Sequence, residues 1–242
     1  MAPGSRPPSS PRPAMVDAPH FSDATFAFLR DLAENNDRDW FKANKSRYES
    51  DLKDPAIRFI LAMGERLDAL SPSLRADPRP VGGSMFRVYR DVRFSKDKSP
   101  YKTHVGIQFR HAAGKDAHAP GLYLHIEPDE CFMGLGSWRP ASPAVRAIRE
   151  AMVDRPDAWR AAVAALDEGP LSLAGDALKR IPRGFDKEHP LADDLRRKDF
   201  IATATLDPAD VRRADLPDRL LERAMAGRPL LQFLCDALGV AR

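Results

Sequence analysis

Segments in the middle of the chain alternate between apolar residues and polar residues or glycine, and this period-two pattern constrains the fold most strongly. Apolar residues occupy every second position of the segments 104–110, 122–127 and 131–136, and Met85 to Arg90 alternates in the same way. Because successive side chains of a strand point to opposite faces, these segments predict a sheet with one buried face and one polar face. The link Pro128–Asp129–Glu130 is short enough for an antiparallel hairpin.

Helical spacing dominates the first third of the chain. Ser22 is expected to cap a first helix that ends near Asn35–Asn36, with Phe21 and Phe26 as a hydrophobic staple. Asp37 is expected to cap a second helix. Asp54–Pro55 combines a capping residue with a proline at the first helical position and predicts the start of a third helix. The sequence therefore predicts a helical layer ahead of the strands.

The second half of the chain reads as helices with short strands between them. Helices are expected after Ser142–Pro143, around Trp159 and over Leu216 to Leu238, interrupted at Gly227, and strands over Ala177 to Ile181 and Phe200 to Leu206. Residues 1–20 are rich in Pro, Ser and Arg and predict a disordered tail. Residues 21–242 predict a single α+β domain, in which helices cover one face of a mostly antiparallel sheet.

Positive charge is concentrated beside the predicted strands. From Ser84 to His104 there are six basic and two acidic residues, while the whole chain has a formal net charge of only +3. We call Asp91–Lys102 the central loop. Arginine and lysine there could hold a carboxylate or phosphate, with Asp91 and Asp97 positioning the cations through salt bridges and the loop's aromatic residues anchoring it. The candidate ligand-binding residues are Arg87, Tyr89, Arg90, Arg93, Lys96, Lys98, Lys102 and Tyr123.

The polar faces of the strands form the second part of the predicted site. They carry Arg87 and Tyr89, then His104 and Gln108, then Tyr123, His125 and Glu127, with Gly106, Gly134 and Gly136 among them. Glycines inside strands often mark a bulge or the close approach of a ligand or another backbone. His104, His125 and Glu127 are the acid–base candidates, because such groups exchange protons near neutral pH. The alternatives are that the face is solvated or is packed by a helix, and that the loop is a solvated charged hairpin.

A metal interpretation uses the same residues. Two histidines and one carboxylate form the ligand set of non-haem iron sites, and His125 and Glu127 share a strand face with His104 on a neighbouring strand. No motif spacing supports this set, and both histidines could equally be ordinary hydrogen-bonding residues. The sequence therefore assigns no metal ligand and leaves the cofactor unknown.

Three function classes remain open. We prefer binding of, or action on, a small anionic or phosphorylated ligand; the alternatives are a nucleic-acid-binding module and a protein-interaction domain. No dinucleotide fingerprint, P-loop or nucleophile elbow occurs. The widely spaced Cys131 and Cys235 suggest reduced thiols and a cytoplasmic protein. No apolar run approaches the length of a membrane span and the N-terminus lacks an apolar signal core, so no membrane role is expected.

Four stretches together resemble a known family. They are FSDATFAFLRDLAENNDRDWFKANKSRYE, FRVYRDVRFSKDKSPYKTHVGI, YLHIEPDECFMGLGSW and LKRIPRGFDKEHPLADDLRRKDF. They are similar to the uncharacterised family known as domain of unknown function 2461, over about residues 21 to 235. The resemblance implies a single domain without an assigned activity, so no catalytic or binding residue is carried over from it.

Overall fold

An antiparallel sheet lies at the centre of the protein. The computed structural model describes residues 20–114 and 119–242. The strand order is β1-β2-β3-β5-β4, and every neighbouring pair is antiparallel. The strands are β1 (Val105–Arg110), β2 (Gly121–Ile126), β3 (Cys131–Ser137), β4 (Ser172–Ala174) and β5 (Phe200–Thr205). The predicted α+β fold and the β2–β3 hairpin are confirmed.

Helices precede and follow the strands. The first group is α1 (Asp23–Glu34), α2 (Arg38–Ala43), α3 (Lys45–Arg47), the π-helical segment η1 (Tyr48–Lys53), α4 (Asp54–Gly64) and the 3₁₀ turn η2 (Leu67–Ala69). The second group is α5 (Ser142–Asp154), α6 (Pro156–Ala164), the 3₁₀ turn η3 (Ala165–Glu168), α7 (Ala192–Leu195), α8 (Pro208–Val211), α9 (Leu216–Met225) and α10 (Arg228–Ala237). Within the described residues, no helix is long and apolar enough to cross a membrane.

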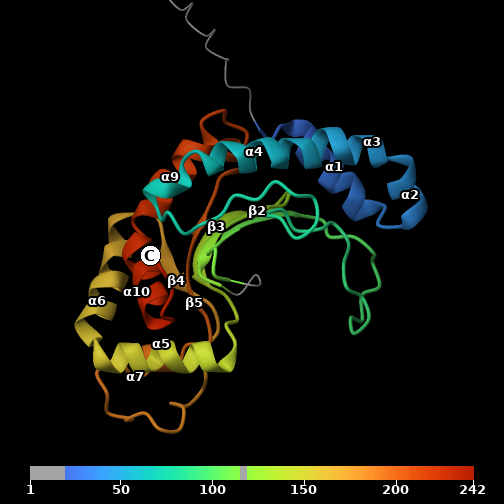
Figure 1. Cartoon of the computed structure of the whole chain (residues 1–242). Coiled ribbons are helices and arrows are strands. Elements are labelled where there is room, and N and C mark those ends of the chain that lie inside the picture. Colours follow the sequence, from blue (N-terminus) through green and yellow to red (C-terminus); the bar gives the residue numbers. More distant parts are fainter. Residues whose placement is uncertain (1–19, 115–118) are drawn as a thin grey trace, which may run out of the picture.

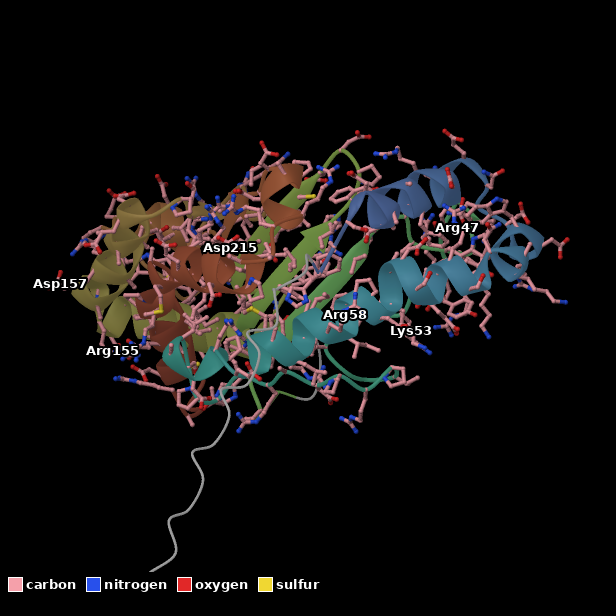
Figure 2. All side chains as sticks on the ribbon, turned by 90° about the horizontal axis from the view of Figure 1, so that it is seen from above. Arg47, Lys53, Arg58, Arg155, Asp157 and Asp215 are labelled. Carbon is pink, nitrogen blue, oxygen red and sulfur yellow. The ribbon has the colours of Figure 1, made fainter. Side chains whose placement is uncertain are left out.

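The helices cover one face of a curved sheet. Figure 1 shows α4 and α10 along the outer side of the curve, and Figure 2 shows α4, with Arg58 labelled, lying across the strands. Phe59 of α4 packs against Phe109 of β1, with ring centroids 6.2 Å apart. Trp159 of α6 lies between Phe233 of α10 and Phe200 of β5. One face of the sheet is therefore buried under helices, as the period-two pattern predicts.

The third predicted helix is part of a continuous rod over 45–64, made of α3, η1 and α4, whereas the second predicted helix is interrupted at Asn44, whose φ of −103° and ψ of 17° end α2. α4 begins at Asp54 as expected, but it follows η1 without a break. Pro55 has no N–H to offer the carbonyl of Asp51, and its ring crowds that carbonyl, which favours a wider turn. The hydroxyl of buried Thr25 on α1 donates to the Asp51 oxygen at 2.6 Å instead. The proline thus leaves the Asp51 carbonyl available to the Thr25 hydroxyl, and this hydrogen bond links α1 to the rod.

The predicted strand over Met85–Arg90 is wrong as a regular strand. This segment pairs with the chain before and in β1 only through isolated bridges, Met85 with Ile107 and Tyr89 with Tyr101. Met85 and Tyr89 are four residues apart, whereas their partners Ile107 and Tyr101 are six apart. The partner segment therefore accommodates two extra residues as a bulge. Alternation along one segment cannot reveal this change, because it depends on how the partner is spaced.

The predicted strand over Ala177–Ile181 is also wrong. Ala177 forms a single bridge with Arg197, and the regular strand lies earlier, at β4. Gly175 follows β4 with φ +96°, a left-handed conformation that turns the chain out of the sheet. Most of the predicted N-terminal tail, residues 1–19, lies outside the described residues. Its last residue, His20, packs edge-on against Phe59 with ring centroids 5.7 Å apart.

Replacing Thr25 by valine should destabilise the fold without changing side-chain shape. The substitution removes the donor to the Asp51 carbonyl and the acceptor of the Ser22 N–H, so we expect a loss of about 1–2 kcal/mol in the free energy of unfolding. Urea denaturation measures this. Thr205→Val, at an exposed strand end, is the matched control and should change stability by less than about 0.5 kcal/mol. Equal effects of both substitutions would contradict the proposed role of Thr25.

Candidate functional site

The face of the sheet opposite the core helices carries a pocket of about 530 Å³. Because directly paired residues share a face, the strand register groups the residues on this side into rows. The rows are Gly106–His125–Phe132–Thr205, Gln108–Tyr123–Gly134–Thr203 and Arg110–Gly121–Gly136–Ile201. Most of these residues line the pocket floor, and Phe86, Lys102, His104, Leu135 and Trp138 complete its lining. The polar, glycine-containing face expected from the alternation is thus a hollow surface.

The three glycines predicted to mark the site have different roles. A Cβ at Gly106 would meet the Tyr123 hydroxyl at 2.8 Å and Phe86 at 2.9 Å, so this glycine makes room for two pocket side chains. Gly136 has φ +124°, and a Cβ there would lie 2.2 Å from the Phe200 carbonyl oxygen. At Gly134 the nearest atoms are 3.8–4.0 Å from such a Cβ. Gly134 is therefore the glycine whose missing side chain leaves the floor open without being required by the backbone.

His104, His125 and Glu127 come together at the edge of the pocket. The rings of His104 and His125 have centroids 4.4 Å apart, and Nε2 of His125 lies 3.3 Å from Oε2 of Glu127. The register explains this meeting, because Val105 pairs with Ile126 and the next pair outward would be His104 with Glu127. The second face of His125 stacks on Phe132 at 4.7 Å. The acid–base candidates thus form one cluster.

Neighbouring hydroxyl groups orient this cluster. The Tyr123 hydroxyl lies 3.1 Å from Nδ1 of His125, and the Thr103 hydroxyl donates to Oε1 of Glu127 at 3.0 Å. Burial, with His125 as the next cause, lowers the pKa of His104 to about 4. Burial and the nearby Glu127 carboxylate raise the pKa of Tyr123 to about 12. At neutral pH the pocket lining therefore offers an uncharged imidazole at His104 and a protonated phenol at Tyr123.

Lys102 is the cation of the pocket lining. Its ammonium nitrogen lies 5.3 Å from the ring centroid of Phe86, a cation–π geometry. Burial, and then the charge of Arg87, lower the pKa of Lys102. Over residues 20–114 and 119–242, no carboxylate forms a salt bridge with this ammonium group. Of the six basic candidates, only Lys102 lines the pocket.

The remaining basic candidates, in the central loop and just before it, lie outside the pocket. Arg90 pairs with Asp97, and Arg93 pairs with Asp91 at 2.7 Å. Hydrogen bonds from Ser99 and then Arg90 hold the pKa of Asp97 well below its usual range, and those from Arg93 lower the pKa of Asp91 to about 2. The two aspartates therefore hold the arginines through salt bridges, as the sequence analysis expects. Figure 1 shows this loop extending away from the strands.

The other loop candidates are exposed. Arg87, Lys96 and Lys98 are exposed on the surface, and Lys98 donates to the Val92 carbonyl oxygen at 2.9 Å. Tyr89 lies 5.4 Å from Tyr101 in an aromatic cluster away from the pocket lining. The structure therefore does not bring these four residues into the pocket.

The base of the loop is anchored by one of its two aromatic residues. Tyr101 is buried, stacks on Phe41 with centroids 4.1 Å apart, and has both its backbone N–H and its carbonyl bonded at 3.0 Å by the side chain of Asn36. Phe94 is 95% exposed. The expectation that both aromatic residues anchor the loop is thus right for Tyr101. It is wrong for Phe94, whose side chain is almost fully exposed.

Sequence reasoning missed several pocket residues. Phe86, Phe132 and Trp138 supply aromatic surface. The sequence carried a signal for two of them, because Phe132 and Trp138 are each separated from Gly134 and Gly136 by an even number of positions. A strand that alternates with period two places all four on one face. Phe86 gave no comparable signal, since its position depends on the irregular pairing before β1.

The fold and the pocket define an α+β domain that presents a hollow, partly aromatic sheet face. A family model matches residues 24–233, and the family is described as a conserved hypothetical protein, DUF2461. The match spans most of the chain, so the protein belongs to this family, as the resemblance predicts. A search of curated proteins and a search of solved structures each found no significant match.

The two floor glycines should respond differently to alanine. Gly136→Ala places a methyl group against the Phe200 backbone at a positive φ, so we expect a loss of at least about 2 kcal/mol in the free energy of unfolding. Gly134→Ala meets only ordinary contacts and should leave stability unchanged or raise it by up to about 1 kcal/mol. Chemical denaturation of the two variants checks this. A loss at Gly134 equal to that at Gly136 would show that the floor is not open.

Proposed function

We propose that the domain binds a small organic anion, a carboxylate or phosphate ester with an apolar body, in the sheet pocket. The observation that supports this most directly is Lys102, a half-buried ammonium group on the pocket lining. A desolvated cation with no carboxylate partner in the described part of the chain is unfavourable, and an anionic ligand would supply the missing charge. Lys102 therefore takes the role first assigned to the whole cationic loop.

The rest of the lining suits the apolar body of such a ligand. Phe86, Phe132, Trp138 and Ile201 offer apolar and aromatic surface around the open floor at Gly134. Small-molecule sites are typically apolar hollows with a few placed polar groups, and about 530 Å³ lies within their usual size range. We infer that ring or chain atoms lie over the floor while the anionic group faces Lys102.

The same lining holds groups that could act on a bound ligand. His104, His125 and Glu127 form one hydrogen-bonding cluster, and His104 is uncharged at neutral pH because burial lowers its pKa to about 4. Glu127 and His125 can pass a proton between them across 3.3 Å. We propose these three as the reacting or polarising groups, with Tyr123 positioning His125.

A nucleic-acid interface has less support. Stacking of successive bases would need several accessible aromatic faces. Tyr101 is buried and Tyr89 packs beside it, which leaves Phe94, 95% exposed, as the accessible aromatic residue of the described loop. Arg90 and Arg93 are engaged by aspartates within the loop.

We propose a cytoplasmic protein, because Cys131 and Cys235 are both free and buried.

Replacing Lys102 by methionine should weaken anion binding and improve stability. The substitution removes the desolvated charge and keeps the aliphatic stem, so the melting temperature should rise while affinity for an anion falls by at least about tenfold, or ~1.4 kcal/mol. A thermal-shift screen of aryl and alkyl carboxylates and phosphate esters identifies the probe, and calorimetric titration measures its affinity.

Lys98→Met is the matched control, because Lys98 is an exposed lysine of the same loop. It should leave the affinity for that anion unchanged. Equal weakening by both substitutions would move the site to the loop. An unchanged affinity in Lys102→Met would overturn the assignment of Lys102.

Filling the floor at Gly134 should block the ligand without unfolding the protein. Valine there projects into the pocket from a position where a Cβ has ordinary contacts. We expect a graded loss of affinity, from Gly134→Ala to Gly134→Val, with the latter reaching at least about tenfold. Ligand binding should also change the fluorescence of Trp138, which is 49% exposed and lines the pocket. Full binding by folded Gly134→Val would place the ligand elsewhere.

A further inference from the structure

The cluster at the pocket edge has the geometry of a ligand set. One potential ligand atom from each of His104, His125 and Glu127 lies within 4.8 Å of those of the other two. A metal ion with bonds of about 2.0–2.2 Å to nitrogen and oxygen would hold such atoms at most about 4.4 Å apart. Small side-chain rotations therefore suffice to bring all three onto one ion. The chain positions that supply them lie just before β1, in β2 and just after β2.

Each of two candidate ligands has a hydrogen-bonding partner on the side away from the cluster centre. The Tyr123 hydroxyl lies 3.1 Å from Nδ1 of His125, which leaves Nε2 directed at Glu127. Thr103 donates to Oε1 of Glu127 at 3.0 Å, which leaves Oε2 directed at His125. Such outer partners orient metal ligands. With a metal on Nε2, the proton of His125 would sit on Nδ1 and be donated to the Tyr123 oxygen, while Thr103 keeps Oε2 of Glu127 facing His125.

We propose that His104, His125 and Glu127 bind one divalent transition-metal ion, of the zinc or iron(II) class, at the edge of the sheet pocket. Two imidazoles with one carboxylate select such ions over magnesium and calcium, which prefer oxygen. Three protein ligands leave coordination positions open, and both His104 and His125 line the pocket. The metal site itself does not depend on the proposed function. Only the occupant of the open coordination positions does, and we infer that it is the anionic group of the ligand, which also faces Lys102.

The test is a titration of the full-length, chelator-treated protein with zinc chloride alone, followed by calorimetry. We expect one ion per chain. His104→Ala and Glu127→Gln should each weaken zinc binding by at least about 100-fold, and Tyr123→Phe, which removes an orienting partner, by about 10–100-fold. Cobalt(II) bound to the wild type should show visible absorption that the His104→Ala variant lacks.

His189→Asn is the control, because His189 lies outside the cluster and its Nδ1 accepts from the Leu191 N–H, a contact that asparagine can keep. It should bind zinc like the wild type. No stoichiometric zinc, iron(II) or manganese binding by the wild type would overturn the proposal, as would equal losses in His189→Asn and His104→Ala. Thermal unfolding of each variant confirms that it is folded; if His104→Ala is not, Glu127→Gln, which keeps size and hydrogen bonds, decides.

The two proposals can fail separately. Gly134→Val should bind zinc like the wild type while it excludes the organic anion, because the floor is not part of the ligand set. Zinc binding without any anion binding would support the metal site and remove the anion proposal. Anion binding that persists in chelator-treated protein, together with no metal binding, would do the reverse.

Discussion

The antiparallel register of β1, β2 and β3 is the constraint on which both the core and the pocket depend. Val105 pairs with Ile126, and Gly106 pairs with His125. A shift of one residue would turn the apolar set away from α4 and bury Tyr123 and His125 under the helices. The hydrophobic energy of one face therefore fixes the polar groups of the other. The pocket groups need no strong contacts of their own to be held in place, and this leaves them available to a ligand.

The fold was predictable wherever one segment carried its own signal. Alternation identified β1, β2 and β3, and the capping pattern at Ser22 located α1. The failures arose where structure depends on a partner. The bulge opposite Met85–Arg90 is set by the spacing of the partner residues 101–107. The rod through Pro55 is stabilised by the Thr25 hydroxyl from another helix. No window of sequence contains both halves of such a contact.

The grouping of the candidate residues in space was predictable for the sheet and not for the loop. His104, Tyr123, His125 and Glu127 meet because alternation and pairing place them on one face. The loop looked like an anion cradle because its cations outnumber its aspartates, and the sequence does not show that only Lys102 among the basic candidates reaches the pocket lining. Its arginines lie next to aspartates close in sequence, and two-residue and seven-residue spacings let them pair locally. Lys102 differs because it lies at the sheet, where burial removes its solvent and no carboxylate of the described chain replaces it.

The electrostatics of the pocket edge explain why a cation and an anion could be held there together. Burial keeps His104 uncharged at neutral pH, so Lys102 faces no charged histidine at that position. Glu127 is engaged by Thr103 and His125. A divalent ion between His104, His125 and Glu127 would make the cluster positive overall, and an anionic group could then lie between two positive centres. Without the ion, the carboxylate of Glu127 opposes such a group. The metal and the anion are therefore expected to bind with positive cooperativity, each raising the affinity of the other by the same factor.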